Sequence, residues 1–151
     1  MNKKLFWVGV ALVTGVVYTG VVFAQDKPEV LVKQRQAVMT LQGKYFGPLL
    51  GMAQGKIPYN AEIAARNAAY LNMLGKMPWD GFVPTTQDVK SQALPEVFRD
   101  PAKFKNAQER LQDAVTKLVG VKTGDEAAAK AAIADVGKAC GSCHESFRQK
   151  N

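Results

Sequence analysis

Two cysteines and a histidine lie close together near the C-terminus. The stretch Cys140-Gly-Ser-Cys143-His144 has the spacing of a c-type haem attachment motif. Residues three apart lie on one side of a helix, so both sulfurs can reach the two vinyl groups of one porphyrin. His144 follows Cys140 by about one turn, so its imidazole can ligate the iron of the same ring. The spacing therefore predicts one covalently bound haem c per chain, with His144 as the proximal ligand.

The same two thiols could instead form a disulfide or a redox-active dithiol. A disulfide across three positions of a continuous helix would be strained, and a thioredoxin-like motif would accompany a βαβ pattern that this sequence lacks. Cys140 and Cys143 are the only cysteines, and His144 is the only histidine, among the 151 residues. A single histidine also excludes a multi-histidine zinc site or a bis-histidine metal pair within one chain. We therefore favour haem attachment.

Residues 1–24 have the pattern of a secretory signal peptide. Two lysines precede an apolar run over residues 5–23, and Ala24 ends a motif that predicts cleavage before Gln25. The alternative is an uncleaved membrane anchor, since the run approaches the ~20 residues that span a bilayer. Glycine and threonine dilute the run, so we predict cleavage and an exported domain over residues 25–151.

The composition of the mature chain fits one globular domain. Removal of 24 of the 151 residues would leave 127, and the loss of two lysines would lower the formal net charge from +7 to +5. The basic residues are scattered, and aromatic residues do not alternate with them as a base-stacking surface would require. We interpret them as solvated helix faces, and we expect neither nucleic-acid binding nor membrane association after signal cleavage.

Apolar residues of the mature chain recur at helical spacing, with almost no strand-like alternation. We expect helices over residues 29–53, 60–76, 101–122 and 125–148, and an irregular, proline-containing segment over residues 77–100. Short links after the first and third helices predict an all-α fold, an antiparallel four-helix bundle. Such bundles hold cofactors between facing helices, where we expect the haem.

The sixth iron ligand separates two functions. With His144 bound on one side, methionine, lysine, water or no ligand remains for the other. Met39 is the one methionine of the mature chain that is expected midway along a helix on an inward face. A thioether bond from Met39 would make the protein a low-spin electron carrier. A Met39 that only shields the iron would leave a five-coordinate, apolar site for small neutral diatomic gases.

Three polar residues are candidates for contacts with the porphyrin. Arg148 lies four residues after His144 on the same face, where it can flank the proximal side or complement the helix dipole. Arg35 and Gln36 precede Met39 by about one turn. They can hydrogen-bond the haem propionates or lie on a solvated face, and their spacing alone does not separate these alternatives.

Large aromatic side chains occur in the irregular segment, among them Trp79, Phe82 and Phe98. A loop with buried aromatic residues usually packs against another part of the protein or against a ligand. These residues either cover the core of the bundle or form a wall of a ligand pocket.

With these features, the sequence resembles cytochrome c′, of the class II cytochromes c. The resemblance covers essentially the whole mature region. Its most specific part is Cys140-Gly-Ser-Cys143-His144-Glu-Ser-Phe147-Arg148. Residues 35–41, 55–59, 78–82, 95–98 and 136–140 also carry it.

The resemblance implies a four-helix bundle that dimerises through its first two helices. It also implies a high-spin, five-coordinate haem with an apolar distal face, binding of NO and CO, and a periplasmic location. It places Met39 on the distal side, Arg148 beside His144, and Arg35 and Gln36 near the propionates. Aromatic pocket positions of the family are matched by Trp79, Phe82 and Phe104.

Two functions are therefore expected. The first is a gas-binding periplasmic haem protein that buffers or removes NO, with electron transfer to a periplasmic redox partner as a further role. The alternative is a low-spin electron-transfer cytochrome with Met39 as the sixth ligand. We do not expect an enzyme, because no second histidine or evident distal acid–base pair supports a peroxidase.

Overall fold

The computed structural model describes residues 26–122 and 124–150. The predicted signal peptide, residues 1–24, lies outside the described residues. Within the described part of the chain, no helix combines the length and the apolar character needed to cross a membrane.

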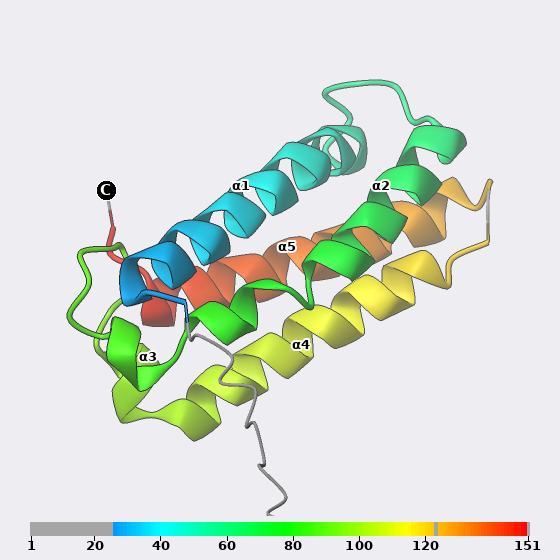
Figure 1. The fold of residues 1–151 in the computed structure, drawn as a ribbon. Coiled ribbons are helices and arrows are strands. Elements are labelled where there is room, and N and C mark those ends of the chain that lie inside the picture. The colour runs from blue at the N-terminus through cyan, green and yellow to red at the C-terminus, as the bar shows by residue number, and fades with distance from the viewer. Residues whose placement is uncertain (1–25, 123, 151) are drawn as a thin grey trace, which may run out of the picture.

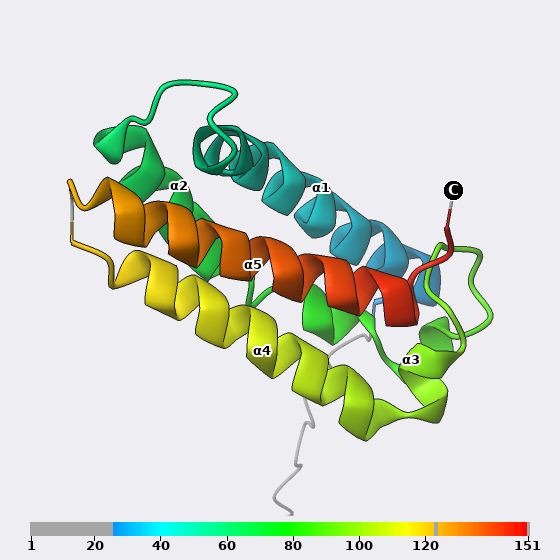
Figure 2. The same cartoon turned by 180° about the vertical axis from the view of Figure 1, so that it is seen from behind.

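Four long helices run in alternating directions and form the predicted antiparallel bundle (Figures 1 and 2). They are α1 (Pro28–Ala53), α2 (Ala61–Leu74), α4 (Pro101–Val119) and α5 (Glu126–Phe147). Between α2 and α4 lie two 3-10 turns, η1 (Pro78–Gly81) and η2 (Pro84–Thr86), and the short helix α3 (Glu96–Arg99). The prediction of an all-α four-helix bundle is confirmed.

Three of the long helices begin at side-chain caps. Asn60, Asp100 and Asp125 each accept a hydrogen bond, through a side-chain oxygen, from the backbone N–H three residues later. Such caps satisfy backbone donors that have no partner inside the helix. Because the caps are local, these starting points agree with those expected from the sequence.

Two helices end earlier than the sequence predicted. The helix α2 ends at Leu74, and α4 ends at Val119. In each case the next residue is a glycine, and the N–H of Gly75 or Gly120 closes the last turn. Glycine has a low helix propensity and is common just past a helix end. The expectation that α4 continues to residue 122 was therefore wrong, because Gly120 already ends it.

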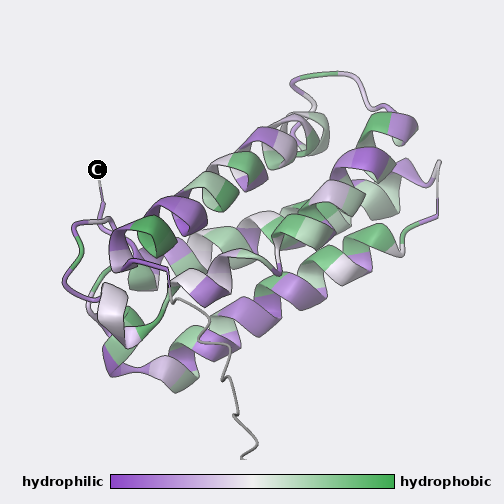
Figure 3. Cartoon of the chain, in the orientation of Figure 1, coloured by the Kyte–Doolittle hydropathy of each residue, from purple (hydrophilic) through white to green (hydrophobic). Residues whose placement is uncertain are grey.

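The core has two parts, and a cavity lies between them, since residues of both parts line it. The larger cluster joins the four long helices, and its members include Leu49, Met52, Ala68, Leu71, Leu111, Val115, Ile133 and Val136. The smaller cluster consists of Val97, Phe104, Ala107 and Phe147. Each long helix mixes hydrophobic and hydrophilic residues (Figure 3), as expected for helices that bury only one face.

Candidate functional site

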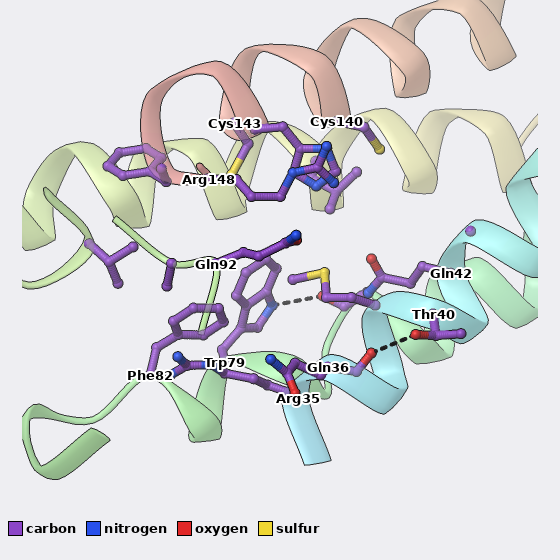
Figure 4. Close-up of a pocket in the computed structure, with 18 of the residues that line it drawn as sticks. Arg35, Gln36, Thr40, Gln42, Trp79, Phe82, Gln92, Cys140, Cys143 and Arg148 are labelled. Carbon is purple, nitrogen blue, oxygen red and sulfur yellow. Dashed lines mark hydrogen bonds between the residues drawn. The ribbon is translucent and has the colours of Figure 1, made fainter. Parts of the chain in front are cut away.

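The cavity has a volume of about 560 Å³, within the ~300–1,000 Å³ typical of ligand pockets. Its walls come from α1, α2, η1, α3 and the segment before it, α4 and α5, and Figure 4 shows part of this lining. The structure brings the ten residues that were assigned to haem attachment, iron ligation or haem contacts to this one cavity. They are Arg35, Gln36, Met39, Trp79, Phe82, Phe104, Cys140, Cys143, His144 and Arg148. Their roles toward a bound group stay predictions.

Both cysteines lie on α5 as free, half-buried thiols. Burial raises the pKa of Cys140 to about 11, with the neighbouring Cys143 as the second cause. Burial also raises the pKa of Cys143. Redox-active cysteines need a lowered pKa, so these values argue against a reactive dithiol. Two thiols one helical turn apart on a cavity wall fit the attachment of one porphyrin.

His144 lies at the solvent-exposed edge of the same wall. Partial withdrawal of its ring from solvent lowers the pKa of His144, and the positive charge of Arg148 lowers this pKa further. The neutral imidazole is the form that binds metals. Arg148 follows the end of α5 in extended conformation, and its N–H donates to the His144 carbonyl oxygen at 3.1 Å. Arg148 is therefore both a neighbour of His144 and the cap of its helix.

Arg35 is buried, with 3% of its surface exposed. Its guanidinium donates hydrogen bonds to the Gly81 carbonyl oxygen at 2.5 Å, to Thr86 Oγ1 at 3.0 Å and to Ser91 Oγ at 3.1 Å. The guanidinium carbon also lies 4.2 Å from the centre of the Phe82 ring. The alternative of a solvated face is therefore wrong for Arg35.

The charge of Arg35 has no anionic partner among the described residues, none of whose ion pairs includes it. Burial lowers the pKa of Arg35, which reflects the cost of removing a cation from water. A carboxylate in the cavity would offset that cost. The haem propionates are carboxylates, so this buried cation fits the predicted cofactor. Gln36, in contrast, is exposed on the rim of the cavity.

Met39 is half-buried and lines the cavity. The other methionines of the described chain do not line it. Met52 is buried in the larger core cluster, and Met73 and Met77 are 55% and 52% exposed. Met39 is thus the methionine that is placed to approach a group bound in the cavity.

Aromatic rings form one wall of the cavity. The Trp79 indole N–H donates to the Gly75 carbonyl oxygen at 2.7 Å, which fixes the ring beside the end of α2. The centre of the Phe104 ring lies 6.0 Å from Trp79, 5.0 Å from Phe82 and 5.1 Å from Phe147. Trp79 and Phe82 both pack on the core and line the cavity, so both interpretations hold for them, whereas Phe98 packs against the smaller core cluster and does not line the cavity.

Sequence reasoning missed the partners of Arg35. Thr86 and Ser91 gave no motif, because a hydroxyl in a loop carries no positional signal of its own. Gly81 did lie in a segment that carries the family resemblance. A Cβ at Gly81 would lie 2.8 Å from the Leu31 carbonyl oxygen and 2.9 Å from Arg35 Cβ. Only glycine lets η1 approach α1 this closely.

Comparison with known proteins gives a consistent result. The family model described as Cytochrome C′ matches residues 30–148. A cytochrome c′ of Rubrivivax gelatinosus is 41% identical over 127 residues, which cover 83% of this chain and 98% of the relative. A cytochrome c′ of Alcaligenes xylosoxydans is 38% identical over 125 residues, covering 82% of this chain and 97% of the relative.

Solved structures give the same match. The crystal structure of the Rubrivivax gelatinosus cytochrome c′ has a TM-score of 0.79 at 40% identity, covering 82% of this chain and 98% of that chain. A nitric oxide complex of an Alcaligenes xylosoxidans cytochrome c′ variant has a TM-score of 0.77 at 37% identity, covering 84% and 99%. A carbon monoxide-bound variant of that protein has a TM-score of 0.76 at 38% identity, covering 82% and 98%.

Proposed function

Because the chain belongs to the cytochrome c′ family, whose members carry covalently bound haem c, we propose that it is a periplasmic haem protein that binds NO and CO. We further propose that it buffers or removes NO, and that it exchanges electrons with a periplasmic redox partner. The family consists of haem proteins and not of enzymes, as the sequence predicted.

The observation that carries the proposal is that the attachment motif and apolar side chains of other elements line the same cavity. Cys140, Cys143 and His144 lie on α5, while Met39 and Trp79 line the same space from α1 and η1. We assign the two cysteines to covalent attachment and His144 to the proximal ligand. The bound haem would supply an iron that can take a gas as a ligand.

The side chains around Met39 suit an uncharged ligand. Met39 and the aromatic rings of Trp79 and Phe82 are uncharged side chains that line this part of the cavity. The buried charge of Arg35 lies behind Phe82, where it is held by loop oxygens. We assign Arg35 and Gln36 to the propionates, Arg148 to the proximal side and Phe104 to the aromatic wall. Relatives with bound nitric oxide and carbon monoxide support this assignment.

One observation favours a second candidate function. Met39 is the only methionine of the described chain at the cavity, and a thioether can ligate haem iron. Ligation would convert the protein into a low-spin electron carrier. We favour the five-coordinate site because the segment around Trp79 and Phe82 resembles the high-spin branch of the family.

Optical spectra of the matured protein test the proposal. We expect high-spin spectra in both oxidation states near neutral pH, and a shift of the ferrous spectrum when CO is added. A sharp low-spin ferrous band that CO leaves unchanged would refute gas binding. In a Met39→Ala variant, an unchanged resting spin state would exclude an iron–sulfur bond, whereas conversion from low to high spin would establish one. Met77→Ala is the matched control, since Met77 is 52% exposed and does not line the cavity.

The proposal includes maturation and assembly. We propose that residues 1–24 are cleaved, that residues 25–151 form the mature domain in the periplasm, and that two copies pair through α1 and α2. Mass spectrometry of protein purified from the periplasm should give the mass of residues 25–151 plus one haem. Retention of the first 24 residues would contradict cleavage, and extraction of the pigment by acidified acetone would contradict covalent attachment.

A further inference from the structure

Residues 91–94, which we name the strap, connect two helices that line the cavity. At one end, Ser91 Oγ accepts a hydrogen bond from Arg35 Nη2 of α1 at 3.1 Å. At the other end, the Leu94 N–H donates to the Phe147 carbonyl oxygen of α5 at 2.9 Å. Residues 91–93 themselves line the cavity, and Figure 4 shows Gln92 between Arg148 and the residues of α1.

Backbone pairing fixes the strap to the end of α5. The Gln149 N–H donates to the Gln92 carbonyl oxygen at 2.8 Å, and Ala93 forms an antiparallel bridge with Arg148. Backbone hydrogen bonds on both sides of Arg148 hold it in extended conformation. The pairing begins at Phe147, within one turn of His144. The strap therefore helps to hold the last turn of α5 and Arg148 in place.

The α1 end of the strap depends on one hydroxyl group. Ser91 Oγ accepts from the Arg35 guanidinium and also from the Ala93 N–H at 3.3 Å. Arg35 is a rigid anchor, because it is buried and also bound to Gly81 and Thr86. Hydrogen bonds from a charged donor are stronger than neutral ones. Loss of this hydroxyl would remove the hydrogen bond between Ser91 and Arg35 and weaken the support that α1 gives to the pairing of the strap with α5.

We propose that Ser91 is a positioning residue for the gas-binding site. Through the strap it fixes Arg148 and the last turn of α5 relative to α1, and so sets the separation between His144 and Met39 within which a gas must fit. This inference rests on the proposed attachment of haem at Cys140 and Cys143. It assigns a role in ligand affinity to a serine that does not itself touch the gas.

Hydrogen exchange of the haem-loaded protein tests the mechanical link without a gas. Ser91→Ala removes the acceptor of a hydrogen bond from a charged group, so it should speed exchange of the Leu94 and Gln149 amides about tenfold or more. Ser91→Thr, which keeps the hydroxyl, should behave as the wild type. Thr85→Val is the matched control, because it removes an exposed hydroxyl from the same irregular segment. Unchanged exchange in Ser91→Ala would overturn the proposal.

Ligand measurements test the functional consequence. We expect Ser91→Ala to change the CO dissociation rate several-fold and to shift the iron–histidine stretching frequency of the ferrous protein, with Ser91→Thr restoring both. If Ser91→Ala only lowers the melting temperature, with both properties as in the wild type, Ser91 is merely structural and the proposal fails. If the wild type does not bind CO, it is the proposed function that fails. The role of Ser91 is then decided by comparing the iron–histidine stretching frequency of Ser91→Ala with that of the wild type.

Discussion

The buried side chain of Arg35 connects several parts of the irregular segment between α2 and α4. It holds the Gly81, Thr86 and Ser91 oxygens and stacks on Phe82. These acceptors are spread over eleven positions of the irregular segment, from 81 to 91. One guanidinium therefore joins parts of a segment whose own backbone hydrogen bonds form only short turns.

Replacement of Arg35 should destabilise the protein strongly. We expect Arg35→Ala to lower the free energy of unfolding by about 2–4 kcal/mol, because buried oxygens lose a charged donor. Arg99→Ala is the control. Arg99 makes an exposed ion pair with Glu96 at 3.7 Å, and its loss should cost under about 0.5 kcal/mol. Urea unfolding measures both values, and equal losses in the two variants would contradict a special role for Arg35.

The pair of His144 and Arg148 predicts a pH dependence. Burial and the charge of Arg148 lower the pKa of the free His144 imidazole. When His144 detaches from the iron, its imidazole is mostly protonated only below that pKa. A protonated imidazole cannot bind the iron again, so protons compete with the iron only in that pH range. Removal of the Arg148 charge raises this pKa, so protons compete at a higher pH.

We therefore expect the iron–histidine bond of Arg148→Gln to be lost at a higher pH than that of the wild type during acid titration. Lys150→Gln is the control, because it removes a positive charge from the same exposed tail. The absorption spectrum in the Soret region follows the titration. A midpoint that is unchanged or lower in Arg148→Gln would contradict the assigned electrostatic role.

At the scale of elements, two glycines on or near α1 should respond in opposite ways. A Cβ at Gly81 would lie 2.8 Å from the Leu31 carbonyl oxygen, whereas a Cβ at Gly43 meets nothing within 4 Å. We expect Gly81→Ala to destabilise the protein by about 1–3 kcal/mol, since α1 and η1 must separate. Gly43→Ala should stabilise the haem-free protein by about 0.5–1 kcal/mol, because Gly43 lies inside a helix and borders the cavity that haem would fill. Thermal unfolding distinguishes them, and a stable Gly81→Ala would show that η1 can shift.

The sequence predicted the helices well because their signals are local. Caps such as Asn60 and the apolar period of each helix act within a few residues, and the structure follows them. The haem motif was recognisable for the same reason, since Cys140, Cys143 and His144 lie within one turn. All of this could be derived without knowing how the helices meet.

The strap could not be predicted, because its contacts join distant parts of the chain. Arg35 and Ser91 are 56 positions apart, and neither residue type marks such a pairing. The alternatives for Arg35 stayed balanced in the sequence for this reason. Only the burial of Arg35 decided between the two alternatives. That burial depends on η1 and η2, and short irregular turns of this kind give no hydrophobic periodicity in the sequence.

At the scale of the whole molecule, three exposed apolar residues share a surface of α1 and α2. Leu41, Tyr70 and Met73, the α1–α2 patch, are 40%, 37% and 55% exposed. The centres of the Tyr45 and Tyr70 rings lie 4.7 Å apart, and Gln42 donates to the Leu74 carbonyl oxygen at 2.9 Å. Residues 41–45 therefore lie beside residues 70–74. A clustered apolar surface of this kind indicates an interface.

If two copies pair through this patch, a charge placed in it should separate them. A two-fold interface buries Leu41 twice, and each buried leucine contributes about 1.5–3 kcal/mol. Leu41→Glu should therefore raise the dissociation constant of the dimer by about 100-fold or more. Val119→Glu is the control, because Val119 is 44% exposed on α4, away from the patch.

Size-exclusion chromatography with light scattering should show a dimer for the wild type and for Val119→Glu, and a monomer for Leu41→Glu. The haem spectrum of Leu41→Glu should match that of the wild type, since Leu41 does not line the cavity. A dimeric Leu41→Glu would place the interface elsewhere. A monomeric wild type would mean that the α1–α2 patch has another partner, and the paired assembly would then be refuted while the haem site stands.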